Sequence, residues 1–207
     1  MERNIKNIIF DWGGVLIDLD MDGCVKAFDE IGIKDLYHLL TKAEEANIFK
    51  TYELGNCTTE EFHKEIRKIA NQPISNEQID YVWNAMVKTV PEDKLRLLAE
   101  LRKQYSIYLL SNTNKLHWEY ASAKVFRYGN LELERDDFFK KVFLSYQMHL
   151  AKPDPEIFRT ALREANLNPE ETLFIDDSLV NCEAAASVHL QTAHYIPGTD
   201  LKSVLPK

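Results

Sequence analysis

Five short apolar runs, none longer than six residues, alternate with longer amphipathic segments along most of this chain. Such runs, bounded by polar residues, are typical of strands that are buried on both faces of a parallel sheet. The expected strands are Asn7–Phe10, Ser106–Leu110, Lys141–Leu144, Thr172–Ile175 and Gln191–Ile196. Alternating strands and helices predict an α/β fold, with a Rossmann-like parallel sheet and helices on both of its faces.

Two of the intervening segments carry clear helix signals. Pro91–Tyr105 opens with a proline and two acidic residues, and its leucines recur every three or four residues. In Asp154–Leu167 we expect Asp154 to cap the helix and Pro155 to take the first helical position. The polar stretch 127–137 predicts only a surface excursion.

Residues from about 18 to 88 break the alternation, because they show helical patterns but no convincing strand. One helical pattern runs from residue 37 to a candidate helix-ending glycine, Gly55, and others follow on both sides of Pro73. Three or four helices inserted after the first strand predict a small all-helical cap. We therefore expect a core domain of residues 1–17 and 89–207 and a cap domain of residues 18–88.

The composition disfavours several classes of function. The formal charge is −8 and no basic run exceeds two residues, which argues against a nucleic-acid partner. No stretch approaches the roughly 20 apolar residues of a membrane span, and the first apolar run is too short for a signal peptide. Three widely spaced cysteines do not suggest a disulfide framework or a zinc site. We expect a cytoplasmic protein without nucleic-acid or membrane partners.

Polar side chains follow four of the expected strands closely. They are Asp11, Ser111, Asn112, Lys152, Asp176 and Asp177. Ligands of an open parallel sheet bind in the crevice outside the carboxyl ends of its strands, so we expect these side chains to converge.

This set of side chains suits phosphoryl transfer with Mg²⁺ as cofactor. A phosphate dianion repels a carboxylate nucleophile unless a divalent cation bridges them, and oxygen ligands favour Mg²⁺. Attack by Asp11 would give an aspartyl-phosphate, with Ser111 and Lys152 stabilising the phosphoryl group. Asp11 and Asp177 would bind the metal, while Asp176 would orient Lys152 or lie in an outer shell. The roles of Asp176 and Asp177 stay exchangeable.

Four segments resemble, in order, the motifs of the haloacid dehalogenase (HAD) superfamily. They are DWGGVL at 11–16, LLSNT at 109–113, AKPDPEIF at 151–158 and FIDDS at 174–178. The helical insertion resembles the cap of subclass I. The Gly-Gly variant of the first motif, YELG at 52–55 and SNTNKLH at 111–117 are similar to the branch that includes sugar-1-phosphate phosphatases. The resemblance implies a phosphatase that acts on a small phosphorylated metabolite such as a sugar phosphate.

The chain departs from the family pattern at Gly13, where an aspartate usually protonates the leaving group. The resemblance implies that the Gly13 carbonyl still binds the metal, while a general acid, typically worth about 10²–10⁴ in rate, is missing. His117, Asp18 and Asp20 are the candidate replacements.

Further residues are candidates for binding the substrate. The full candidate set is Trp12, Gly13, Tyr52, Glu53, Ser111, Asn112, His117 and Lys152. Tyr52 and Glu53 precede the expected cap turn at Gly55. His117 lies one helical turn after Thr113 and can face the site, with helix packing as the alternative.

Two other functions stay open. A 2-haloacid dehalogenase would use Asp11 to attack carbon without a metal, although it would have no reason to gather three carboxylates. A catalytically weak phosphate-binding protein would follow from the loss of the acid at Gly13. Halide release without Mg²⁺ would support the dehalogenase, and binding of phosphorylated ligands without turnover would support the phosphate-binding protein.

Overall fold

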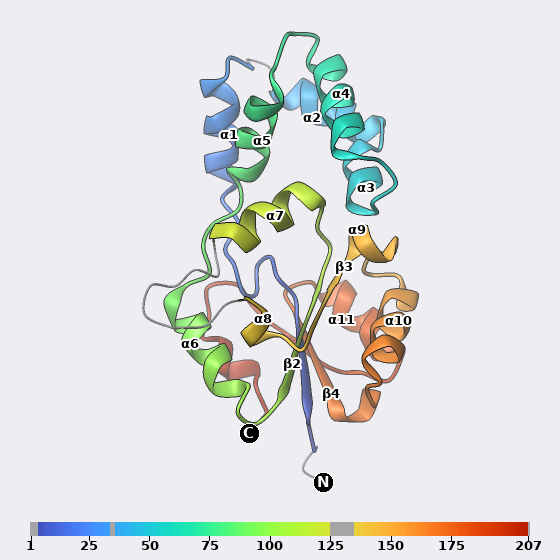
Figure 1. The fold of residues 1–207 in the computed structure, drawn as a ribbon. Helices are drawn as coiled ribbons and strands as arrows, with labels where there is room; N and C mark the ends of the chain where they lie inside the picture. Colours follow the sequence, from blue (N-terminus) through green and yellow to red (C-terminus); the bar gives the residue numbers. More distant parts are fainter. Residues whose placement is uncertain (1–3, 34–35, 125–134, 207) are drawn as a thin grey trace.

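The computed structural model describes residues 4–33, 36–124 and 135–206. A five-stranded parallel sheet lies at its centre, in the order β3-β2-β1-β4-β5 (Figure 1). The strands are β1 (Asn7–Phe10), β2 (Ser106–Ser111), β3 (Lys141–Leu144), β4 (Thr172–Asp176) and β5 (Gln191–His194). The predicted α/β fold is confirmed. Two strands extend one residue beyond prediction, because Ser111 pairs with Leu144 and Asp176 pairs with His194.

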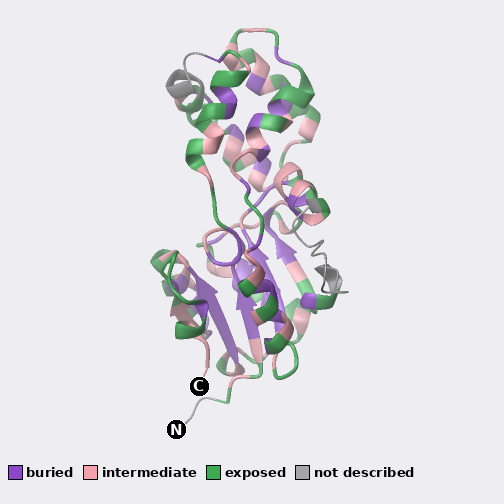
Figure 2. Cartoon of the chain, turned by 90° about the vertical axis from the view of Figure 1, so that its left-hand side faces the viewer, coloured by how far each residue is buried: buried purple, intermediate pink, exposed green. Residues whose placement is uncertain are grey.

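Helices cover both faces of the sheet, and the central strands β1, β2 and β4 between them are largely buried (Figure 2). The edge strand β5 has no buried residue and ends at His194, two residues before the predicted Ile196. On one face pack α6 (Glu92–Leu101) and α7 (Lys115–Lys124), and on the other α10 (Pro155–Ala165) and α11 (Leu179–Ala186). Side chains alternate between faces along a strand, so Ile8 joins the first cluster and Ile9 joins the second. Asp154 caps α10 as expected, accepting a hydrogen bond from the Glu156 amide at 2.9 Å.

Short elements complete this domain. They are α8 (Arg135–Phe138), α9 (Ser145–Met148) and the 3₁₀ turns η1 (Pro169–Glu171) and η2 (Leu201–Val204). Of the polar stretch 127–137, residues 127–134 lie outside the described residues, and the remainder belongs to α8.

A helical bundle lies beyond the carboxyl ends of the strands (Figure 1). Its helices are α1 (Met21–Glu30), α2 (Leu36–Glu45), α3 (Ile48–Glu53), α4 (Thr59–Ala70) and α5 (Asn76–Asn84). The described insertion thus has five helices, not three or four. The expected helix ending at Gly55 is divided at Asn47, which adopts a left-handed conformation with φ of 58°. Thr58 and Ser75 begin α4 and α5 with capping boxes.

Two connections join the bundle to the sheet domain, and they run side by side. Leu19 and Val87 form an antiparallel bridge, and the Asp20 amide donates a hydrogen bond to the Met86 carbonyl at 2.8 Å. The expected boundaries at residues 17/18 and 88/89 fall beside this crossing, and the division into two domains stays a prediction. In the part of the chain that the structure describes, no helix is long and apolar enough to cross a membrane.

Candidate active site

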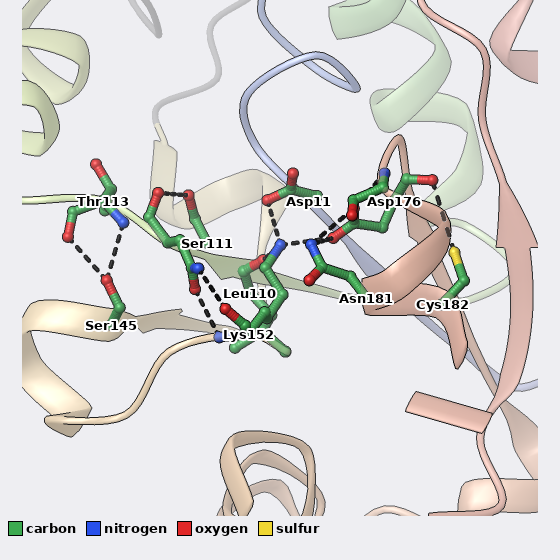
Figure 3. A network of polar contacts seen from close by, with 11 residues as sticks. Asp11, Leu110, Ser111, Thr113, Ser145, Lys152, Asp176, Asn181 and Cys182 are labelled. Carbon is green, nitrogen blue, oxygen red and sulfur yellow. Dashed lines mark hydrogen bonds and ion pairs between the residues drawn. The ribbon is translucent and has the colours of Figure 1, made fainter. Parts of the chain in front are cut away.

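Three predicted site residues meet at the carboxyl end of the sheet (Figure 3). Lys152 Nζ lies 2.7 Å from Asp11 Oδ1 and 2.6 Å from Asp176 Oδ2. These side chains come from three segments of the chain: β1 and β4 are neighbours in the sheet, and Lys152 lies in the loop after α9. The Lys152 side chain is 1% exposed, and the two carboxylates are 11% and 0% exposed. Because burial removes the hydration of these charged groups, each of them is stabilised mainly by its oppositely charged neighbours.

Asn112 fixes the backbone of Lys152. Its side-chain Nδ2 donates to the Lys152 carbonyl at 2.8 Å, and its Oδ1 accepts from the Lys152 amide at 2.8 Å. Lys152 Nζ also donates to the Leu110 carbonyl at 3.2 Å. Asn112, expected to contact substrate, lines the cavity described below, but both polar ends of its amide are already occupied in positioning Lys152.

Asp176 is saturated with donors. Its carboxylate accepts from Lys152, from the Ser178 amide at 2.7 Å, and from Asn181 Nδ2 at 3.1 Å on each oxygen. Asn181 was not predicted from the sequence, although its amide stands out in the otherwise mainly apolar helix sequence LVNCEAAA. No other described residue donates a hydrogen bond to the Asp177 carboxylate, so its oxygens remain available.

The site fits a hard divalent cation. One ligand oxygen each from Asp11, Asp176 and Asp177 lies within 4.8 Å of the other two. A Cβ on Gly14 would stand 2.2 Å from Asp177 Oδ2, so only glycine lets this carboxylate lie against the turn after β1. The backbone bonds of that turn use the Trp12 and Ile17 carbonyls, and none of the described amides donates to the Gly13 carbonyl. Carboxylate and carbonyl oxygens are the donors that Mg²⁺ prefers.

Burial dominates the electrostatics of these acids. It raises the pKa of Asp11 to about 6, with the charge of Asp176 adding to this and Lys152 opposing it. Burial also raises the pKa of Asp177, again with a contribution from Asp176. For Lys152, burial lowers the pKa less than the two neighbouring carboxylates raise it. The cluster therefore favours a bound cation, which would offset repulsion among the carboxylates.

A cavity of about 290 Å³ lies between the sheet domain and the helical insertion. The sheet domain contributes Trp12, Gly13, Ser111, Asn112, Thr113 and His117, and the insertion and its connections contribute Ile17, Leu19, Phe49, Glu53, Trp83, Met86 and Val87. Among the described residues, Glu53 is the only charged side chain in this lining. None of these described lining residues is a Lys or Arg.

Backbone contacts seat the helical insertion on the sheet domain. Ser145 Oγ lies 2.7 Å from the Glu53 carbonyl, and His149 Nδ1 donates to the Leu54 carbonyl at 2.8 Å. A Cβ on Gly55 would stand 2.0 Å from the Tyr146 carbonyl oxygen. Ser145 also accepts from the Thr113 amide at 2.9 Å. Sequence reasoning missed Ser145, although it follows β3 directly, as Asp11 follows β1.

His117 joins the two parts of the molecule through both ring nitrogens. Nε2 donates to the Trp83 carbonyl at 2.8 Å, which leaves Nδ1 to accept from Asn114 Nδ2 at 3.2 Å. Its ring stacks on the Trp83 indole, with 5.1 Å between ring centroids. Burial lowers the pKa of His117 to about 4. The ring lines the cavity as a neutral group with no free proton donor.

Tyr52 is not brought to the cavity. It is 2% exposed, stacks on Phe62 at 4.3 Å and shares a hydrogen bond with Thr59 Oγ1 at 2.9 Å. These contacts place it in the apolar cluster of the helical insertion. Its neighbour Glu53 lines the cavity. The two residues lie on different sides of α3, because neighbouring residues of a helix differ by about 100° in direction. Substrate contact by Glu53 stays a prediction, whereas Tyr52 does not line the cavity.

Comparisons with known proteins agree with this geometry. The model of the haloacid dehalogenase-like hydrolase family matches residues 5–189. A D-ribitol-5-phosphate phosphatase of Bacteroides thetaiotaomicron is 34% identical over 201 residues, with 97% of each chain covered. The crystal structure of a HAD family enzyme from the same organism has a TM-score of 0.92 at 39% identity, covering 98% of this chain and 99% of that one. Another structure, of the wild-type enzyme with magnesium and inorganic phosphate, has a TM-score of 0.88 at 40% identity, covering 95% and 96%. The chain belongs to the haloacid dehalogenase-like hydrolase family.

Proposed function

We propose that this protein is a Mg²⁺-dependent phosphatase that hydrolyses a small phosphorylated metabolite through an aspartyl-phosphate on Asp11. The observation that carries the proposal is the cluster of three carboxylates, two of them buried and paired with Lys152, with ligand oxygens within 4.8 Å of one another. The similarity to a D-ribitol-5-phosphate phosphatase and to an enzyme crystallised with magnesium and phosphate supports the same reaction.

The residues of the site have different roles in the proposed reaction. Asp11, Asp177 and the Gly13 carbonyl would hold Mg²⁺, whose charge would let a carboxylate approach a phosphate dianion. Asp177 suits direct binding better than Asp176, because Asp176 already accepts hydrogen bonds on both oxygens. Asp176 keeps Lys152 in place, and Lys152 stabilises the phosphoryl charge in the transition state.

Ser111 completes the phosphoryl site at the end of β2. Its side chain is buried, and its hydroxyl has only a long 3.4 Å contact to the Asn112 carbonyl, so it remains able to donate to a phosphoryl oxygen. The leaving group would occupy the cavity of about 290 Å³. With no basic side chain in its described lining, this cavity favours an uncharged leaving group such as a polyol or sugar over one with a second anion.

Asp11→Asn tests the proposal, since an amide cannot act as the nucleophile. Hydrolysis of 4-nitrophenyl phosphate and of D-ribitol 5-phosphate should fall to background while the circular dichroism spectrum stays unchanged. Wild-type activity should vanish in chelator and return with Mg²⁺. Chloride release from a 2-chloroacid in chelator would instead support a dehalogenase, and ligand binding without turnover would support a silent binding protein.

A further inference from the structure

The turn after β1 has no side chain at Gly13 that could donate a proton, although there is space for one. Gly13 follows the proposed nucleophile by two residues and lines the cavity, but it carries no side chain. A Cβ there would meet nothing closer than Leu19 Cδ1 at 3.5 Å, an ordinary contact. Cleaving a bond to a basic alkoxide leaving group nevertheless requires a proton, so another residue is needed to supply it.

Three groups near the cavity are already engaged elsewhere. His117 is neutral and donates its one ring proton to the Trp83 carbonyl. Asp20 caps α1 through the Gly23 amide at 2.8 Å and lies 3.4 Å from Lys88. The Asp18 side chain is 57% exposed, lies 3.7 Å from Lys94 and does not line the cavity. None of the three can donate a proton into the cavity in this arrangement.

Glu53 differs from all three. It lines the cavity together with Gly13 and Ser111, at the end of α3 nearest the sheet domain. Its carboxyl group has no hydrogen-bond or ion-pair partner among the described residues. Its backbone is fixed, because the Glu53 carbonyl lies 2.7 Å from Ser145 Oγ and the next carbonyl accepts from His149.

The surroundings of Glu53 also favour its protonated form. Burial alone raises the pKa of this carboxyl, and no nearby cation opposes the shift. A carboxylic acid that is desolvated, unpaired and held on an anchored backbone has the properties of a general acid.

We propose that Glu53, supplied by the helical insertion, is the catalytic acid and base that replaces the side chain missing at Gly13. This inference rests on the proposed phosphatase reaction. It also assigns the substrate class: phosphate esters of ordinary alcohols, such as a primary alcohol of a polyol, whose leaving oxygen needs a proton.

The proton and bond changes balance over two steps. As Asp11 forms a bond to phosphorus, the bond from phosphorus to the ester oxygen breaks, and that oxygen takes the Glu53 proton and leaves as an alcohol. The Glu53 carboxylate then accepts a proton from water as the water oxygen attacks phosphorus. Asp11 leaves as a carboxylate, inorganic phosphate is released, and Glu53 is protonated again.

Glu53→Gln tests the assignment with two substrates of different leaving-group basicity. The value of kcat/KM, which covers the steps through departure of the leaving group, should fall by about 10²–10⁴-fold for D-ribitol 5-phosphate, because the amide keeps the size of the side chain but cannot donate a carboxylic proton. For 4-nitrophenyl phosphate, whose phenolate leaves unprotonated, kcat/KM should fall less than about tenfold, because little general-acid help is lost. Glu60→Gln makes the same change on an exposed residue of α4 and should alter neither rate.

A second variant separates loss of the acid from damage to the fold. Gly13→Asp in the Glu53→Gln background should restore kcat/KM for D-ribitol 5-phosphate in part, since the position has room for a Cβ. An equal fall in kcat/KM for both substrates, or a rise in KM with kcat unchanged, would overturn the assignment and leave Glu53 as a binding residue. Failure of the phosphatase proposal itself would be distinct: Asp11→Asn would then still hydrolyse 4-nitrophenyl phosphate.

Discussion

The sheet domain and the helical insertion bring different kinds of charged group to the candidate site. Charged groups of the sheet domain are tied to one another, since Lys152 contacts Asp11 and Asp176 while Asp176 accepts three further hydrogen bonds. The insertion contributes Glu53, whose carboxyl has no partner among the described residues. The charged groups of the sheet domain are thus held by one another, and we call them the fixed side of the site; the insertion, whose Glu53 carboxyl is available to a ligand, is the free side.

The two sides also differ in what holds them. Strand pairing and a buried ion cluster fix the sheet-domain residues, so changing one of them disturbs the others. The insertion is held over the cavity through backbone carbonyls of Glu53 and Leu54 and through the close approach of Gly55. Contacts made by backbone atoms leave the cavity-lining side chains free to change. In the proposed reaction, the nucleophile and the metal ligands come from the sheet domain, whereas the insertion would supply the acid and contact the leaving group.

Gly14→Ala should break the fixed side with the largest effect. The new Cβ would stand 2.2 Å from Asp177 Oδ2, and the residue has φ of 76°, so the carboxylate must move. Displacing a reacting group by about 1 Å can lower the rate about 10²-fold, so kcat/KM should fall by about that factor. The Mg²⁺ concentration that gives half-maximal activity should rise. Gly198→Ala is the control, since it has φ of 86° and nothing within 4 Å. An unchanged Mg²⁺ titration would exclude Asp177 as a ligand.

The contact between His117 of the sheet domain and Trp83 of the insertion should contribute less to stability in acid. Because burial lowers the pKa of His117 to about 4, the unfolded chain takes up the proton first as pH falls below the ordinary value of 6.5. The contribution of neutral His117 to stability is therefore fully present above pH 6.5 and is lost as the pH falls toward 4. The free energy of unfolding should drop by about 2 kcal/mol between pH 7 and pH 5 from this residue.

Denaturant unfolding at several pH values measures that drop. His117→Gln should remove this part of the pH dependence, because it leaves no imidazole to protonate. His189→Asn, at an exposed position with positive φ, should leave the profile as in the wild type. A His117→Gln profile as steep as that of the wild type would show that other groups cause the loss in acid.

Gly55→Ala should disturb the free side by displacing Glu53. Its Cβ would stand 2.0 Å from the Tyr146 carbonyl oxygen, so the insertion must shift away from the sheet domain. The value of kcat/KM for D-ribitol 5-phosphate should fall about tenfold, equivalent to about 1.4 kcal/mol, and it should fall less for 4-nitrophenyl phosphate. Gly32→Ala, with φ of 81° and nothing within 4 Å, controls for backbone strain alone. An equal loss on both substrates would contradict a role of the insertion in departure of the leaving group.

The fixed side could be predicted from the sequence because parallel strands end at one edge of a sheet. Asp11, Ser111 and Asp176 follow or end buried runs, so their meeting needed only the strand assignment. The division of the fold into sheet and helical insertion came from the same patterns. Asn181 and Ser145 were missed because their roles depend on contacts across segments, which no local pattern records.

The free side could not be predicted, since it depends on which way short helices face. Helix α3 has only six residues, too few for its periodicity to show which face is buried. Tyr52 and Glu53 looked equivalent beside the Gly55 turn, yet one packs inside the insertion and the other lines the cavity. The expected helix also divides at Asn47, so α3 does not continue α2.

Tyr52→Phe should have the smallest effect and checks that Tyr52 lies outside the cavity. It removes the hydroxyl that contacts Thr59 Oγ1 and keeps the ring that stacks on Phe62. The free energy of unfolding should fall by about 1 kcal/mol, the usual value of one hydrogen bond, while KM and kcat stay unchanged. Tyr81→Phe, which loses an exposed bond to Glu30, should cost less than about 0.5 kcal/mol. A clear rise in KM for Tyr52→Phe alone would mean that its hydroxyl reaches the substrate, and the selecting surface of the insertion would then include both residues.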